Sequence, residues 1–220
     1  MPKPEKLSFK EAAVVPKTFL AAYEALFLLA KLQPTEKVLI HTAAGEIGTA
    51  AIQLAHSTDS EIFVTCGKQN EIEACKKLGA DYAINSTEHD FVKRIAHHTG
   101  GKGVNVILDF TGGHQNQSAL ALDGRLIWLE WPSDSKSGSF SLFTVLKKGI
   151  SITSSNLRNK SLDYKIDLTQ KFQADFLEML ADGHIRPVID SAQHWHNVEK
   201  AHKRMAQNKN TGKIVLTFDE

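Results

Sequence analysis

The sequence predicts an α/β fold, a doubly wound parallel sheet with helices on both faces. Short apolar runs alternate with helical segments from residue 37 onward, which is the pattern of βαβ units. The runs are continuous, as in Val38-Leu39-Ile40, which is expected of parallel strands covered on both faces. The first run also leads through a turn of small residues directly into a helical segment. Parallel strands joined by crossover helices account for all three observations.

The N-terminal region is predicted to be helical. Ser8 and Glu11 have the spacing of a capping box, in which the two side chains satisfy amide donors at a helix start. After Pro16, six apolar residues recur at helical spacing and predict a second helix that ends at Gln33-Pro34: Phe19, Leu20, Tyr23, Leu26, Phe27 and Ala30. The most apolar stretch, residues 19–30, is shorter than the roughly 20 residues that cross a bilayer. No membrane span is therefore expected.

Strands and helices then alternate along the chain. Strands are expected at 37–41, 62–65, 82–84, 104–109 and 125–129, with helices at about 47–55, 70–78 and 91–98. Residues 131–138 are rich in Ser, Asp, Lys and Gly and are expected to form a surface loop. A helix at 140–147, a strand at 150–153, a long helix at about 164–181 and a final strand at 213–218 complete the prediction.

The composition favours a small-molecule ligand. Of 220 residues, 42 % are apolar, which is enough for a substantial core. The 26 basic and 25 acidic residues leave a net charge of +1, so no charged field attracts nucleic acid or an anionic membrane. Cys66 and Cys75 are too few for a disulfide framework and lack the neighbouring ligands of a zinc site. The start of the chain has no apolar signal region, and we expect a cytoplasmic protein without a metal.

A candidate phosphate turn follows the first predicted strand. Small residues let the backbone approach a pyrophosphate, and a glycine at position 48 lets the next helix pack closely on the strand. Free amides and the helix dipole then favour an anion. The strand, turn and helix together predict a Rossmann dinucleotide site rather than a tight connection without a ligand. Its candidate residues are Ala44, Gly45, Glu46, Ile47 and Gly48.

The end of the second strand predicts which dinucleotide binds. Residues 65–69 lack the carboxylate that would bind the ribose 2′-hydroxyl of NAD, whereas Gly67 and Lys68 suit a 2′-phosphate. We therefore expect NADP(H), although Lys68 is equally explained as a solvated surface charge, and Glu71 would repel the phosphate. Three further residues at strand ends complete the candidate site, with the first two flanking the adenosine: Phe110, Thr111 and Leu129. A methyltransferase that binds S-adenosylmethionine is the open alternative.

Six segments resemble the zinc-independent quinone oxidoreductases of the medium-chain dehydrogenase/reductase superfamily. They are residues 7–16, 37–41, 48–55, 77–81, 120–125 and 208–216. The resemblance implies a homodimer or homo-oligomer that uses NADPH to reduce a quinone, an enone or a related electrophilic acceptor. It also implies three parts: a helical lead-in from the catalytic domain at 1–33, a dinucleotide-binding Rossmann domain at 34–183, and a C-terminal segment of the catalytic (GroES-like) domain at 184–220.

The chain departs from the pattern of this family in several places. Members normally carry an N-terminal catalytic domain that precedes the matched region, and residues 185–218 would return to it. Five cofactor positions also differ: Glu46 replaces a glycine, Glu71 a lysine, Ser86 a tyrosine and Ala21 a threonine, and residues 130–133 replace a glycine-rich nicotinamide loop. These differences predict weak binding. They leave open a non-enzymatic alternative, an NADP(H)-binding and dimerisation module whose sheet edge lies around 150–153.

No catalytic side chain is expected. The chain has no nucleophile elbow and no ordered set of Ser, His and acid. Hydride transfer needs none, because the nicotinamide carries the chemistry. The histidines at 97–98 and 194–196 are interpreted as surface residues. Cys66 is interpreted as a small residue that fills a strand end, with redox sensitivity as the alternative if its pKa is lowered.

Overall fold

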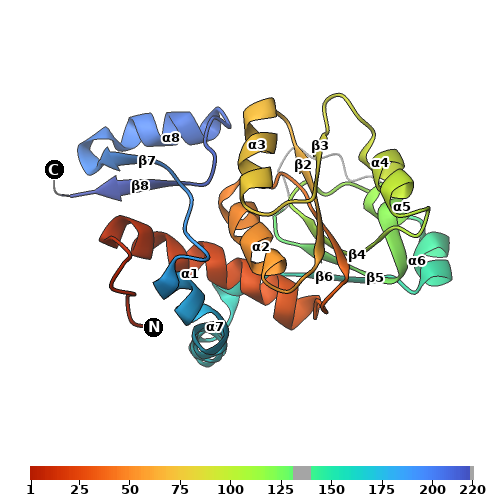
Figure 1. Cartoon of the computed structure of the whole chain (residues 1–220), viewed down its shortest axis with the longest axis horizontal. Coiled ribbons are helices and arrows are strands. Elements are labelled where there is room, and N and C mark those ends of the chain that lie inside the picture. The colour runs from red at the N-terminus through yellow and green to blue at the C-terminus, as the bar shows by residue number, and fades with distance from the viewer. Residues whose placement is uncertain (131–139, 219–220) are drawn as a thin grey trace.

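The computed structural model describes residues 1–130 and 140–218. Six parallel strands form one sheet in the order β3-β2-β1-β4-β5-β6, with helices on both faces (Figure 1). The strands are β1 (Lys37–Ile40), β2 (Glu61–Cys66), β3 (Tyr82–Asn85), β4 (Val104–Asp109), β5 (Leu120–Trp128) and β6 (Ser151–Ser154). This arrangement confirms the predicted fold class. The surface loop expected at 131–138 lies outside the described residues.

Two apolar cores cover the two faces of the sheet. Along β1, Val38 and Ile40 belong to one core while Leu39 belongs to the other, as the alternation of side chains along a strand requires. The first core holds α2 (Glu46–His56) and α3 (Gln69–Lys77). The second holds α4 (Phe91–His98), α5 (Asn116–Ala119) and α6 (Leu142–Lys148). Because both faces are buried, the strands need continuous apolar runs.

The N-terminal helix is continuous, and the expectation of two helices is wrong. The capping box of Ser8 and Glu11 is present at the start of α1 (Phe9–Tyr23). The helix passes through Pro16, whose side chain is exposed, into a π-helix at Glu24–Leu29. Burial of apolar residues on both sides of Pro16 offsets the missing backbone hydrogen bond. The whole segment, residues 9–29, is long and apolar enough to cross a membrane, but 61 % of its most apolar window is buried in the fold, as in a core helix.

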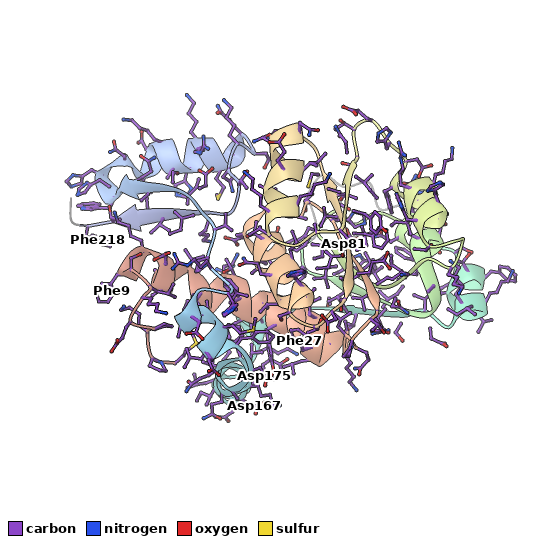
Figure 2. The ribbon with its side chains drawn as sticks, in the orientation of Figure 1. Phe9, Phe27, Asp81, Asp167, Asp175 and Phe218 are labelled. Carbon is purple, nitrogen blue, oxygen red and sulfur yellow. The ribbon has the colours of Figure 1, made fainter. Side chains whose placement is uncertain are left out.

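A long helix, α7 (Leu162–Asp182), packs against this segment. Phe27, Phe172 and Phe176 stack beside the Tyr23 ring, whose hydroxyl donates to Asp175 at 2.6 Å. Figure 2 shows Phe27 and Asp175 where the two helices meet. Aromatic pairs and this hydrogen bond therefore join the lead-in helix to the region after the sheet.

The C-terminal region forms a second, smaller sheet. Its strands β7 (Ile189–His194) and β8 (Lys213–Thr217) pair in parallel, joined through α8 (Val198–Ala206). Short 3-10 turns lie at Leu157–Asn159 and Trp195–Asn197. The pair packs against α1 at one end of the molecule, where the exposed rings of Phe9 and Phe218 lie (Figure 2). Neither β7 nor α8 was predicted from the sequence.

Candidate dinucleotide-binding site

The turn after β1 presents backbone amides to an anion. Its N-cap, Gly45, has extended backbone geometry, with φ −69° and ψ 174°, and α2 begins at Glu46. Gly45 has no side chain that could cap α2, so the helix dipole and the first-turn amides are available to a ligand. The turn lies between β1 and β4, where the strand order of the sheet reverses. Open α/β sheets bind their ligands at this kind of switch point.

Gly48 is required by the close approach of α2 to the strand. A Cβ atom at this position would lie 2.5 Å from the carbonyl oxygen of Ala43 and 2.7 Å from its Cα. Gly45 is less restricted, since its Cβ would lie 3.3 Å from the carbonyl oxygen of Thr42. The glycine at 48 therefore sets the distance between helix and strand, in agreement with the packing argument from the sequence.

The carboxylate of Glu46 is held by two lysines. Lys17 of α1 and Lys213 of β8 each form an ion pair with it, and the Glu46 side chain is 22 % exposed. Burial lowers the pKa of both ammonium groups, and repulsion from Lys213 lowers that of Lys17 further, while Glu130 opposes these effects. A backbone bond from Gly212 to the Ala44 carbonyl, 2.8 Å long, fixes β8 beside the turn. The turn therefore carries an acid already paired within the protein.

A second carboxylate occupies the donors expected to bind a 2′-phosphate. Glu71 accepts from the Gly67 amide and from the Lys68 ammonium, each at 3.0 Å. The ammonium also donates to the backbone carbonyl of Asn208, in the C-terminal region, at 2.6 Å. Lys68 is therefore more than a solvated surface charge. A phosphate at this position would have to exchange with Glu71.

A buried carboxylate organises the end of β4. One oxygen of Asp109 accepts from the amide and hydroxyl of Thr111, both at 2.7 Å, and from the Gly112 amide at 3.2 Å. The other oxygen accepts from Asn116 at 2.9 Å and from the Trp128 indole at 3.0 Å. Asp109 is fully buried, so these five donors compensate for its lost hydration. The bonds fix the loop that contains the predicted residues at 110 and 111.

A buried histidine extends this network across the sheet. His41 contacts Asn116 through Nε2 at 2.8 Å and the Thr65 hydroxyl through Nδ1 at 2.9 Å. The Asn116 side-chain nitrogen donates to Asp109, so its Oδ1 accepts from His41 and the histidine proton is assigned to Nε2. Nδ1 then accepts from the Thr65 hydroxyl. Burial lowers the pKa of His41 and favours this neutral form. Sequence reasoning missed His41, because its partners are 24 and 75 residues away.

The structure brings all ten predicted residues to the same edge of the sheet. They follow or end β1, β2, β4 and β5: Ala44, Gly45, Glu46, Ile47, Gly48, Gly67, Lys68, Phe110, Thr111 and Leu129. Leu129 is tied there by a 2.9 Å bond from its amide to the Asp109 carbonyl. Of the expected nicotinamide loop, residues 131–133 lie outside the described part of the chain. Whether the ten residues bind a cofactor stays a prediction.

A separate cavity of about 310 Å³ lies beside β3. Its lining is mostly basic and aromatic, and comprises Lys76, Asp81, Tyr82, Ala83, Ile84, His89, Arg94 and His98. None of these belongs to the phosphate turn. Among residues 1–130 and 140–218, no three His, Cys, Asp or Glu side chains gather as metal ligands.

Curated relatives match nearly the whole chain but are much longer. A highly-reducing polyketide synthase of Aureobasidium melanogenum is 34 % identical over 222 residues, which are 98 % of this chain and 10 % of the synthase. A homolog of the synaptic vesicle membrane protein VAT-1 from Danio rerio is 30 % identical, over 98 % of this chain and 48 % of its own. The chain therefore spans half or less of these relatives.

Solved structures share the fold. An NAD-dependent alcohol dehydrogenase has a TM-score of 0.87 and 28 % identity, and the match covers all of this chain and 62 % of that one. The CurK enoyl reductase has a TM-score of 0.84 and 29 % identity, with 99 % and 65 % covered. Here too the chain covers less than two thirds of its relatives.

A sequence model described as zinc-binding dehydrogenase matches residues 47–181, more than half of the chain. Zinc requires three or four Cys, His or carboxylate ligands, and the described residues do not supply such a set. The match instead covers α2 to α7, which contain most of the sheet and the helix of the phosphate turn. The chain belongs to the zinc-binding dehydrogenase family of the medium-chain dehydrogenase/reductase superfamily, as an oxidoreductase-type NAD(P)-binding domain.

Proposed function

We propose that this chain binds NADP(H) and is the cofactor-binding part of a reductase that passes hydride to a quinone or an enone. The observation that carries the proposal is the N-terminus of α2, which has no side-chain cap and lies at the switch point of the sheet. Its amides can satisfy an anion without rearrangement. The pyrophosphate of a dinucleotide supplies that anion in proteins with this strand order.

The residues of the turn would hold the pyrophosphate. Ile47 and Gly48 would contribute backbone amides. The amide of Gly45 donates to the Thr42 carbonyl at 3.0 Å, so Gly45 would serve by letting the phosphate approach the backbone, and Ala44 is fixed beside it by the bond from Gly212. The small side chains keep this surface open to close approach. The bound nicotinamide would supply the hydride, while the protein orients it and excludes water.

The other predicted residues would bind the adenosine half. Lys68 would lie near the 2′-phosphate once Glu71 gives way, and Phe110 and Thr111 would flank the adenosine. The Asp109 network supports this role, because it holds that loop at a fixed place on the rim. Preference for NADPH over NADH therefore depends on whether the 2′-phosphate can replace the Glu71 carboxylate as the partner of the Lys68 ammonium group.

Two considerations support the acceptor. Two solved relatives, CurK and JamJ, are described as enoyl reductases. An enone and a quinone share a carbon-carbon double bond conjugated to a carbonyl, so each accepts hydride at carbon and a proton at a second site. The reaction class is therefore the same for both acceptors.

The proposal includes a cytoplasmic homodimer. The cytoplasm keeps the two cysteines reduced and supplies NADPH. For this dimer we propose a contact at β6, the last strand of the sheet. The helix that precedes it in the chain, α6, packs on β5 and exposes Leu142, Phe143 and Leu146 by 81 %, 73 % and 83 %. An exposed apolar face next to a sheet edge is typical of an interface between chains.

A second function is favoured by the paired carboxylates. Glu46 and Glu71 already neutralise the cations closest to the expected phosphates. A module that binds NADP(H) weakly and dimerises, without turnover, would tolerate this arrangement. It differs from the reductase only in the chemical step.

Binding and turnover are tested separately. NADPH and NADH are titrated by fluorescence, and NADPH oxidation is then followed with a panel of quinones and enones. Tighter binding of NADPH together with oxidation by an acceptor supports the reductase. Binding without turnover, in a chain that sediments as a dimer, supports the module. Failure to bind either nucleotide, or saturable binding of S-adenosylmethionine in their place, overturns both functions.

A further inference from the structure

The two cysteines of the chain are in contact. Cys66 ends β2 and Cys75 lies in α3, and their Sγ atoms are 3.6 Å apart. Cys66 is 2 % exposed and Cys75 is fully buried. Cys66 is followed by the exposed Gly67, so one sulfur lies next to the open rim of the sheet. The pair therefore combines proximity with a nearby route to solvent.

The two sulfurs have different acidities. When Cys66 is ionised, the neighbouring Cys75 thiol can donate to its thiolate, which lowers the pKa of Cys66, and the Ala44 amide lowers it further. The same bond and burial raise the pKa of Cys75. Thiolates are the nucleophilic form of cysteine, so Cys66 is the attacking sulfur and Cys75 the resolving one.

The pair is connected to the phosphate turn. The Cys66 carbonyl accepts from the Ser86 amide at 2.9 Å and hydroxyl at 3.2 Å, and the Ala44 amide of the turn is close enough to the sulfur to lower its pKa. The backbone of this strand end is therefore fixed by Ser86, while its sulfur lies near the turn. A disulfide has sulfurs about 2.05 Å apart, so bond formation moves them about 1.5 Å closer. Movement of the Cys66 sulfur toward α3 would take it away from the Ala44 amide.

We propose that Cys66 and Cys75 form a reversible intramolecular disulfide when the protein meets a hydroperoxide. The Cys66 thiolate attacks the peroxide oxygen, forming a sulfenic acid and releasing an alcohol or, from hydrogen peroxide, water. The Cys75 sulfur then attacks the Cys66 sulfur and expels water, so the two thiols are oxidised by two electrons and the peroxide is reduced. Because this movement would disturb the neighbouring phosphate turn, we expect the disulfide to weaken dinucleotide binding, a consequence that rests on the proposed function.

The test counts thiols in the full chain. Reduced protein is treated with hydrogen peroxide, denatured and alkylated with iodoacetamide, and its mass is measured by mass spectrometry. We expect both cysteines to escape alkylation, with the loss of two hydrogen atoms and a cross-linked peptide that dithiothreitol releases. Cys75→Ser is the matched variant, and its Cys66 should be trapped as a sulfenic acid by dimedone. Two alkylated cysteines in oxidised wild type would overturn the proposal, as would equal oxidation rates for folded and denatured protein.

The effect on the cofactor has its own readout. Oxidised and reduced protein are titrated with NADPH. Oxidation should raise the dissociation constant about tenfold, because displacement of the turn by the moving sulfur would cost one hydrogen bond between a turn amide and the pyrophosphate. Cys75→Ser without peroxide should bind as wild type does. An unchanged affinity in oxidised protein overturns the link to the turn. Absence of NADPH binding in both states contradicts the proposed function, while the thiol count still decides the disulfide.

Discussion

Replacement of Gly48 by alanine should destabilise the protein and abolish tight dinucleotide binding. The added Cβ would lie 2.5 Å from the Ala43 carbonyl oxygen, so α2 and β1 must separate by about 0.9 Å to restore ordinary contact at 3.4 Å. The obstacle is backbone and cannot rotate away. Overpacking costs about 1–3 kcal/mol, and alanine returns up to about 1 kcal/mol of helix propensity. Because the clash is with backbone, we take the upper end of that cost, about 3 kcal/mol, and expect a net loss of about 2 kcal/mol.

Two assays check this value. Urea unfolding followed by circular dichroism gives the free energy of unfolding, and NADPH fluorescence gives the affinity. Gly67→Ala is the control, because its Cβ would lie 3.9 Å from Glu71, at ordinary contact distance. That variant should lose less than about 0.5 kcal/mol. If Gly48→Ala were as stable as the control and bound NADPH as tightly as wild type, the close packing of helix on strand would not be what the turn requires.

Four further predictions concern charged groups. Glu46→Gln should tighten NADPH binding severalfold, because two ammonium groups become free to face phosphate, and should cost about 1 kcal/mol of stability; unchanged affinity in a fluorescence titration would place the carboxylate outside the site. Glu71→Gln should raise the ratio of NADPH to NADH affinity, and an unchanged ratio would contradict the exchange described above. Asp109→Asn should cost about 3 kcal/mol in urea unfolding, because five donors face a fully buried carboxylate; a loss below about 1 kcal/mol would contradict this. Hydrogen bonds from Arg204 lower the pKa of Asp190, so this carboxylate stabilises the fold above the pKa of the unfolded chain and loses that effect as the pH falls below about 4; Asp190→Asn should flatten the acid limb of a stability-pH profile, and an identical limb would refute the assignment.

The sheet was predictable because its signals are local. The strand at 104–109 and the helix at 91–98 were predicted with the bounds that the structure has, since continuous apolar runs and an amphipathic face identify them. The strand at 125–129 was predicted too short, because β5 starts at Leu120 and passes through Asp123, whose φ is +54°. A residue that favours turns inside a strand conceals its true start.

The C-terminal sheet was hidden for a different reason. β7 reads Ile-Asp-Ser-Ala-Gln-His and has neither an apolar run nor a regular alternation. It becomes a strand through its pairing with β8, 24 residues further along at Ile189 and Lys213, and through the tight turn at Gly212. A Cβ on Gly212 would lie 2.3 Å from the Val188 carbonyl oxygen. The two strands can therefore approach this closely only because residue 212 has no side chain. Tertiary pairing thus overrides weak local propensity.

The backbone geometry of the phosphate turn follows from its local sequence, whereas its charge depends on residues distant in the chain. Its geometry comes from consecutive residues, and the strand, the glycines and the uncapped helix were therefore predictable. Its charge depends on Lys17 and Lys213, which lie 29 and 167 positions from Glu46, so no local pattern indicates that this acid is paired. The Ala44 carbonyl of the turn also accepts from the Gly212 amide. At the end of the neighbouring strand β2, Lys68 donates to the Asn208 carbonyl. Residues that sequence analysis assigned to a separate catalytic segment therefore set the electrostatics of the dinucleotide site, and substitutions in β8 should change NADPH affinity even though β8 lies outside the Rossmann sheet.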